Sequence, residues 1–390
     1  MNLASLSASY LRARPLNSAL SVLLLALGVG TIVLLLLVVS QFEERMGNDA
    51  RGVDLVVGAK GSPMQLILSG IYHVDAPTGN IPLAAVQTLQ KNRMVKQAIP
   101  LALGDSWRSY RIVGAGPEYA TLYGAKPRSG RFHDKAMEAV LGAEVAARTG
   151  AGVGATFTGA HGLGGGGDEH EDAYTVVDVL EKTGSVVDRL VLTSIESVWE
   201  VHHDDGGKRE REVTVLLVQY ASPLAAATLP RQINAQSALQ AASPAYETAR
   251  LFRIVGVGVE ALRAFAVALI LAAGLSVFIA LYGALEERRY ELAVMRALGA
   301  SPARLFGLLF TEGLVLALLG AVLGVVLGHL LAAGLGAWLE ATQHYGIAGL
   351  RVLVEELWVA GAALAVGIAA ALPPAWRAYR TDVARTLAQG

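Results

Sequence analysis

The chain has 390 residues, of which 53% are hydrophobic and only 17% are charged. Since soluble domains carry about 25% charged residues, this composition indicates a membrane protein with a sizeable soluble part. The net charge of −1 offers no basic field for nucleic acid, and the absence of cysteine excludes disulfides, thiol nucleophiles and cysteine metal ligands.

Four apolar runs are long enough to cross a membrane, because a bilayer core about 30 Å thick requires about 20 apolar residues in a helix. We expect transmembrane helices over residues 18–40, 264–285, 305–339 and 357–376. The first run exceeds the roughly 7–15 apolar residues of a signal peptide and no small-residue cleavage site follows it, so we expect an uncleaved anchor. Pro373 and Pro374 should stop or kink the fourth helix.

Arginine residues predict the orientation of these helices. They precede the first run, lie between the second and third runs and follow the fourth, whereas the segment between the third and fourth contains only Arg351. Because lysine and arginine near span ends favour the cytoplasmic side, both termini should be cytoplasmic. The remaining layout is a cytoplasmic N-terminal segment (1–17), an extracytoplasmic domain (41–263), a cytoplasmic connection (286–304), a short extracytoplasmic segment (340–356) and a cytoplasmic tail (377–390).

The long region 41–263 has the pattern of a mixed α+β domain. Runs rich in β-branched residues predict strands at 53–58, 110–114, 139–141, 174–180, 189–193 and 213–220. Helical patterns cover 83–92, 144–149 and 223–242. The expected fold class is therefore an α-helical membrane protein with four transmembrane helices in a 1+3 arrangement and an inserted α+β extracytoplasmic domain.

Two loops of this domain combine histidine with carboxylates: residues 161–172 read HGLGGGGDEHED, and residues 202–207 read HHDDGG. Such ligands suit zinc or a similar divalent ion. The candidate metal ligands are His161, His170, His202 and His203. The alternative is that both loops are solvated segments without a ligand, because the spacing is irregular and four consecutive glycines give no rigidity. No GxSxG, HExxH or GxxxxGK[ST] motif accompanies them, so the sequence offers no catalytic or nucleotide site.

The third apolar run carries small residues at intervals of four, which form one stripe on a helix and allow a close approach of backbones. The glycines of this stripe are Gly320, Gly324, Gly328 and Gly336. The stripe could form a subunit interface or a sliding seam, or it could pack against the other spans of the same chain. Glu312 lies in the same run and requires a partner there, for which Arg304 or the Arg288/Arg289 pair is within reach.

The connection between the second and third runs is basic and amphipathic. Gly299 is well placed to end a helix, and Ser301-Pro302 is a typical start for the next. The sequence therefore predicts a short helix, a glycine stop, a sharp turn and then the third span. Without further information, such a basic juxtamembrane helix could serve only to set the topology and to contact lipid phosphates.

This connection resembles a motif of the FtsX/MacB-like (type VII) permease subunits of ABC transporters. Residues 289–300, RYELAVMRALGA, are similar to that family's R-x-E-[IL]-[GA]-x-[LM]-[RK]-A-[LI]-G-A. Residues 374–378, PAWRA, resemble its P-A-x-x-A ending, and residues 382–387 resemble D-P-A-x-x-L with Val383 in place of proline. A looser similarity extends to the outer domain at residues 112–114 (IVG), 130–132 (GRF) and 140–142 (VLG).

The resemblance implies a multi-pass protein of the bacterial plasma (inner) membrane that is not catalytic itself. It implies a dimer, with itself or a similar permease, bound to cytoplasmic ABC ATPases that hold the ATP and magnesium, so this chain would need no cofactor of its own. It also implies that the connection is the coupling helix that docks on the ATPase. The implied coupling residues are Arg288, Arg289, Glu291, Leu292, Met295, Arg296, Leu298 and Gly299.

The expected function is to couple ATP hydrolysis to motion of the outer domain, for export or extraction of a lipid, lipoprotein, peptide or drug, or for mechanical signalling (mechanotransmission). Membrane lipids and a periplasmic or outer protein are further expected partners, and nucleic acid is not. One alternative is a membrane-anchored sensor or scaffold whose outer domain binds a partner or a metal. Another is a membrane enzyme acting at the outer face, which would require clustered acidic or histidine residues there.

Overall fold

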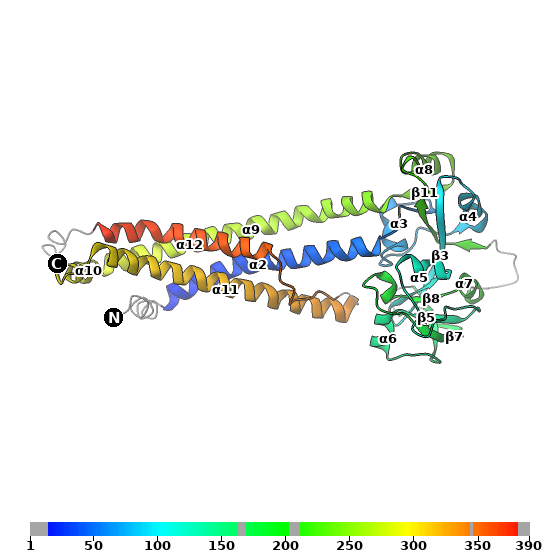
Figure 1. Cartoon of the computed structure of the whole chain (residues 1–390), viewed down its shortest axis with the longest axis horizontal. Helices are drawn as coiled ribbons and strands as arrows, with labels where there is room; N and C mark the ends of the chain where they lie inside the picture. Colours follow the sequence, from blue (N-terminus) through cyan, green and yellow to red (C-terminus); the bar gives the residue numbers. More distant parts are fainter. Residues whose placement is uncertain (1–14, 163–168, 203–210, 344–345, 381–390) are drawn as a thin grey trace. The chain divides into compact units, whose positions relative to one another are not determined.

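The computed structural model describes residues 15–162, 169–202, 211–343 and 346–380 (Figure 1). The chain divides into two units: a helical unit of Met1–Phe42 with Val255–Gly390, and a sheet unit of Glu43–Ile254. The candidate ligand His203 and the motif at 382–387 lie outside the described residues.

The helical unit is built on long apolar helices, each long and apolar enough to cross a membrane. They are α2 (Pro15–Asp49), α9 (Pro244–Glu287), α11 (Pro302–Gln343) and α12 (Glu355–Tyr379), with the short α10 (Arg289–Ala297) between α9 and α11 (Figure 1). Helices α2 and α9 extend well beyond the expected spans, and each continues without a break into the residues of the sheet unit.

Helix α12 passes through Pro373 and Pro374 and ends at Tyr379. A proline inside a helix removes one backbone hydrogen bond and crowds the preceding turn. Here the turns around the prolines are packed: Ala371, Ala375 and Ala378 are all fully buried in one apolar cluster with residues of α9 and α11. Tertiary packing therefore maintains the helix where the sequence predicted a stop or a kink, and the stop was wrong.

The glycine stripe of α11 faces α2 of the same chain. A Cβ atom added to Gly320 would lie 2.7 Å from the Leu25 side chain, and one added to Gly324 would lie 2.6 Å from Cβ of Val29. At Gly328 the same construction meets Cβ of Val33 at 2.7 Å. Gly336 instead approaches the Ile347 backbone in the connection to α12. The stripe thus packs against the chain's own segments, the second of the two interpretations offered by the sequence.

Several polar side chains of the helical unit form pairs. Glu312 is 3.4 Å from an Nη of Arg288, one of the cationic groups expected to reach it. At the other end of α11, Nε2 of His329 lies 3.0 Å from Glu356 Oε2, and Nδ1 lies 2.7 Å from the Gly349 carbonyl oxygen. These contacts connect α11 to the start of α12.

The Gln41 side chain forms two hydrogen bonds with the backbone of the segment that follows α11. Its amide donates to the Ala348 carbonyl at 3.0 Å and accepts from the Ala348 N–H at 2.8 Å. The side chain therefore satisfies both backbone groups of a residue that lies in no helix or strand.

The sheet unit contains a nine-stranded sheet in the order β11-β1-β10-β3-β4-β8-β5-β7-β6. The strands are β1 (Leu55–Ala59), β3 (Val95–Trp107), β4 (Tyr110–Gly114), β5 (Glu138–Leu141), β6 (Thr156–His161), β7 (Glu169–Val179), β8 (Val191–Thr193), β10 (Val215–Tyr220) and β11 (Leu239–Ala242), and β2 (Ile81–Pro82) pairs separately with β9 (Glu212–Val213). The helices are α3 (Pro63–Gly70), α4 (Leu83–Gln90), α5 (Pro117–Leu122), α6 (Ala143–Thr149), α7 (Ile195–Val201) and α8 (Pro223–Gln236), with a 3₁₀ helix η1 (Val186–Arg189).

Strand β6 pairs not only with β7 but also with β3, so the six strands β3-β4-β8-β5-β7-β6 form a closed ring. The closing pairing is short, with Asp105 opposite His161 and Ser106 opposite Ala160. Tyr110, Tyr174 and Phe157 are among the buried residues of the apolar cluster built by these strands. Closure of a sheet removes its exposed edges, and here it depends on two residue pairs.

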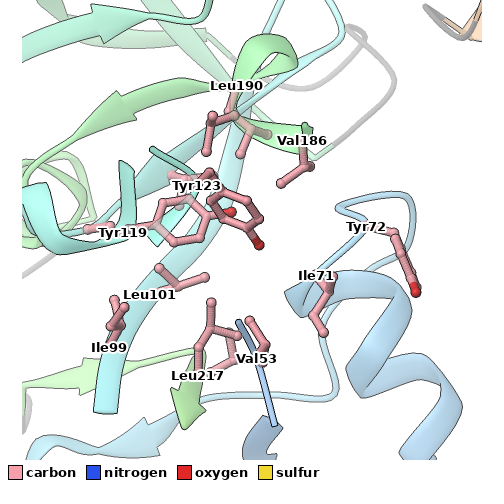
Figure 2. Packing of buried hydrophobic residues seen from close by; sticks show 14 of the residues in the cluster. Val53, Ile71, Tyr72, Ile99, Leu101, Tyr119, Tyr123, Val186, Leu190 and Leu217 are labelled. Carbon is pink, nitrogen blue, oxygen red and sulfur yellow. The ribbon is translucent and has the colours of Figure 1, made fainter. Parts of the chain in front are cut away.

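The largest apolar cluster of the sheet unit surrounds Tyr119 and Tyr123 (Figure 2). Their rings pack edge to face with centroids 5.6 Å apart, and neighbours from β3, β10 and α3 complete the cluster. The Tyr123 hydroxyl donates to the Asp49 carbonyl at 2.8 Å. The last turn of α2 is therefore held by the core of this unit.

Most strands occur where the sequence predicted them, but several elements differ. Residues 161–172, expected as one loop, begin at the end of β6 and finish in β7, which starts at Glu169 and not at residue 174. Helices α3, α5 and α7 and strand β6 were not predicted. Arg189 ends η1, so strand β8 begins only at Val191. The helix expected over 223–242 ends at Gln236, because the last residues form β11, which pairs with β1. The long strand β3 was not predicted, since Lys96, Pro100 and Gly104 interrupt its alternation of apolar residues.

The segment 130–132 has a visible structural role. Gly130 adopts φ +86°, Phe132 packs against the tyrosine cluster, and Arg131 donates from both Nη atoms to Glu138 at 2.9 and 3.0 Å. This pairing, with the backbone N–H groups of Asp134 and Lys135, lowers the pKa of Glu138 to about 2. The ionised carboxylate of Glu138 thus stabilises the turn at residues 130–135.

We expect Glu138 to make the sheet unit acid-sensitive. A carboxyl group with a depressed folded pKa stabilises the fold above its unfolded value near 4.5, and this contribution disappears as pH falls from about 4.5 toward about 2. The protection factors of residues 128–141, which correct hydrogen exchange for its intrinsic dependence on pH, should therefore decrease as pH falls over this range in the native protein. Glu138→Gln should flatten that dependence, and an unchanged profile in the variant would contradict the assignment.

Candidate functional site

The first candidate site is the connection between α9 and α11. Helix α10 spans Arg289–Ala297, and Gly299 follows with φ +99°. The Ala300 N–H donates to the Met295 carbonyl at 3.0 Å, which closes the helix end, and α11 begins at Pro302. A glycine in the left-handed region is the usual way to end a helix in this manner. The helix, stop and restart lie where the sequence predicted them.

One face of α10 is buried. Leu292 and Ala293 are 2% and 0% exposed. Leu292 belongs to the apolar cluster that includes Ala371, Ala375 and Ala378 of α12, and Met295 packs against that cluster. Arg288, just before the helix, pairs with Glu312 in α11. Of the residues predicted for coupling, Arg288, Leu292 and Met295 therefore hold α10 on the helical unit.

The opposite face of α10 is exposed. Arg289, Glu291 and Gly299 lie on it, Arg296 lies at its margin, and Leu298 is 82% exposed. Tyr290 is 55% exposed and was not among the predicted coupling residues. Residue type alone did not identify it, because a tyrosine on an amphipathic helix can face either the bundle or a partner. The exposed face combines two large apolar side chains with charged neighbours.

The second candidate site is a cluster of side chains in the sheet unit. Asp105 comes from β3, His161 from the end of β6, His170 from β7 and His202 from the residue after α7. Their nearest nitrogen and oxygen atoms all lie within 4.8 Å of one another. Three of the four predicted metal ligands are thus brought together from separate elements.

Asp105 is the centre of this cluster. Its Oδ1 lies 3.4 Å from His161 Nδ1, 3.2 Å from His170 Nε2 and 3.4 Å from His202 Nε2. Burial acts to raise the pKa of Asp105, but the imidazoles of His202 and His170 outweigh it and lower that pKa. Asp105 in turn raises the pKa of His202 above its ordinary value.

Sequence reasoning missed Asp105, although a signal was present. The residue is a carboxylate inside an otherwise apolar stretch, LALGDSW, and an unpaired charge is rarely buried in a strand. Its partners are 56 or more residues away in sequence, since the nearest, His161, follows it only in β6. Only the closed ring of strands brings them together.

Comparisons with known proteins agree with the four apolar helices and the inserted sheet unit. The family profile described as "MacB-like periplasmic core domain" matches residues 18–236, and the one described as "FtsX-like permease C-terminal" matches residues 263–383. The first of these covers more than half of the chain. The two matches define a class of protein, the membrane-embedded permeases of ABC transporters. Within that class, the chain belongs to the FtsX/MacB-like family.

Three solved domains are similar to part of this chain. The periplasmic region of MacB from Actinobacillus actinomycetemcomitans is 13% identical, with a TM-score of 0.35, over 52% of this chain and 95% of that one. The extracellular domain of the noncanonic ABC-type transporter YknZ from Gram-positive bacteria is 13% identical, with a TM-score of 0.30, over 48% and 98%. A domain of a putative permease protein from Porphyromonas gingivalis is 16% identical, with a TM-score of 0.29, over 49% and 89%. No curated protein matches the chain.

Proposed function

We propose that this chain is the non-catalytic permease subunit of an ABC transporter and that a separate cytoplasmic ATPase docks on the exposed face of α10. The observation that carries the proposal is the division of α10 into a buried face and an exposed face. Leu292 and Ala293 fix the helix on the bundle, which leaves Tyr290 and Leu298 accessible beside Arg289 and Glu291. Large apolar side chains with charged neighbours are typical of protein interfaces.

The arginine distribution supports a topology for this proposal. Arginines before α2, in the α9–α11 connection and after α12 favour the cytoplasm for both termini and for α10. The sheet unit would then lie outside the cytoplasm of a bacterial plasma membrane. A dimer with itself or a similar permease follows from the family.

The proposed action is mechanical. Residues 18–40, 264–285 and 357–376 contain no charged side chain, and a polar conduit would need such groups. ATP-driven movement at α10 would instead reach the sheet unit through α2 and α9, which continue into it. The cargo would be a lipid, lipoprotein, peptide or drug that is exported or extracted, or the movement itself would be the signal.

The test is co-purification of the full chain with its ATPase from the native cells in mild detergent. The unmodified permease should retain an ABC ATPase and its ATP hydrolysis. Leu298→Glu combined with Glu291→Lys should reduce the bound ATPase at least about 10-fold, since losing an interface hot spot costs about 2 kcal/mol or more. Membrane insertion should be unaffected.

Leu224→Glu is the matched control, because Leu224 is 70% exposed on α8 of the sheet unit and lies outside the proposed interface. This variant should keep the ATPase. Full retention of the ATPase by the α10 variant would disprove docking on this face. The absence of any ATPase from the unmodified complex would favour an anchored sensor or scaffold instead.

A further inference from the structure

We propose that Asp105, His161, His170 and His202 bind one zinc ion, and that this ion fastens β6 to β3 and so secures the closed ring of strands. The proposal concerns the sheet unit alone and does not depend on the docking of an ATPase at α10. Three imidazoles and one carboxylate form a ligand set that zinc accepts readily. Four protein ligands without an open position indicate a site that holds the ion rather than one that activates water.

The distances from Asp105 Oδ1 to the three imidazoles fit a tetrahedral ion. Bonds of about 2.0–2.1 Å from zinc to nitrogen and oxygen place neighbouring ligand atoms about 3.3–3.4 Å apart. The three histidine nitrogens lie 3.2–3.4 Å from Asp105 Oδ1. Ordinary N–H···O hydrogen bonds have a shorter typical length of about 2.9 Å. These three distances are therefore closer to those of a coordination shell than to those of hydrogen bonds, and a bound ion would draw the histidine nitrogens, which lie within 4.8 Å of one another, to the same spacing.

Burial supports the same conclusion. The side chain of Asp105 is 1% exposed, and both of its carboxylate oxygens lack a hydrogen-bond partner among the described residues. Nε2 of His170 is also buried without such a partner. A buried carboxylate is costly unless it is paired or coordinates a metal. A bound dication would be a common partner for Asp105 Oδ1 and His170 Nε2, which lie 3.2 Å apart without forming a hydrogen bond.

A second shell orients one of the ligands. The Nδ1 of His202 lies 2.8 Å from the Val198 carbonyl oxygen, in the last turns of α7. A carbonyl can only accept, so Nδ1 carries the proton and Nε2 presents its lone pair to the cluster. Metal-binding histidines are usually oriented in this way.

The position of the cluster explains what an ion would do. Asp105 and His161 are directly opposite each other in the two-pair seam that closes the ring, and His170 and His202 attach β7 and the end of α7 to the same point. One ion would therefore join β3, the consecutive strands β6 and β7, and the end of α7. Exposed fractions of 53% for the His161 side chain and 34% for that of His202 leave the site accessible from solvent.

The experiment uses the full chain in detergent, stripped with a chelator and titrated with Zn²⁺ by calorimetry, with the metal content measured after gel filtration. We expect one equivalent of zinc per chain. His170→Ala should weaken binding by more than the roughly 10–100-fold that loss of an outer-shell partner costs. Zinc should also slow amide exchange in β6 and in residues 102–107 of β3.

Two further variants make the result decisive. Asp105→Asn removes a buried charge with little change of shape, so the variant should fold. Its affinity for zinc should nevertheless be at least about 10-fold lower than that of the unmodified chain. His344→Ala, which removes a histidine outside the four proposed ligands, is the matched control and should bind zinc normally. Equal zinc uptake by the unmodified chain and the Asp105 and His170 variants would overturn the proposal, as would uptake without any change of exchange in β6.

Discussion

Gly328→Leu is expected to force α11 away from α2 and to lower the unfolding temperature of the helical unit. A Cβ atom there would lie 2.7 Å from Val33 and 2.9 Å from the Gly30 carbonyl oxygen. A backbone oxygen cannot rotate away as a side chain can, so the helices must move apart. Overpacking of this kind costs about 1–3 kcal/mol or more, and Gly324→Leu on the same stripe should add to it.

Thermal unfolding in detergent, followed by fluorescence-detected gel filtration, measures this loss. Gly334→Leu on the same helix is the matched control, because a Cβ there meets no atom of the described structure within 4 Å. Leucine is also a better helix former than glycine by about 0.8 kcal/mol, so the control should be neutral or slightly stabilising. Equal unfolding temperatures for the two variants would show that α2 and α11 do not pack closely.

Arg189→Met is expected to destabilise the sheet unit strongly. The Nη2 atom of Arg189 lies 2.8 Å from Asp49 Oδ2. The side chain of Asp49 is 3% exposed, so Arg189→Met would leave its carboxylate buried without this cation. Removing one partner of a buried ion pair typically costs about 3–5 kcal/mol. Hydrogen exchange of residues 43–49 and 186–189 in the full chain should accelerate accordingly.

A double substitution separates charge burial from lost packing. Asp49→Leu together with Arg189→Met should be more stable than Arg189→Met alone, because no unpaired charge then remains. Arg148→Met provides a comparison, since the Arg148–Glu144 pair is partly exposed and separated by 3.4 Å. Such a pair contributes about 0–1 kcal/mol. Similar effects at positions 148 and 189 would contradict the importance assigned to burial.

The helical unit was largely predictable because its signals are local. Long uncharged runs, the arginines around them and the Gly299 stop each depend on neighbouring residues alone. The ends of α2 and α9 were not predictable in this way, since hydropathy falls where they leave the apolar runs while helical structure continues to Asp49 and begins at Pro244. Contacts within the sheet unit, such as that of the Tyr123 hydroxyl, fix these ends.

The two candidate sites were also predictable only as far as their signals are local in sequence. Residue type alone identified three histidines of the cluster, but Asp105 could not be associated with them before the ring of strands was known. For α10, the motif indicated which residues belong together but not which face is buried. Amphipathic patterning cannot tell a contact within the chain from a contact with a partner, and Leu292 and Leu298 illustrate the two cases.

Asp49 is the last residue of an uninterrupted 35-residue helix, and its carboxylate is fastened to Arg189. Each residue of an α-helix advances the chain by about 1.5 Å and turns it by about 100°. One residue added between positions 42 and 49 would therefore aim the carboxylate away from Arg189, whereas seven added residues would nearly restore its direction. Angular phase along the last turns of α2, and not their length alone, therefore decides whether the Asp49 carboxylate meets Arg189.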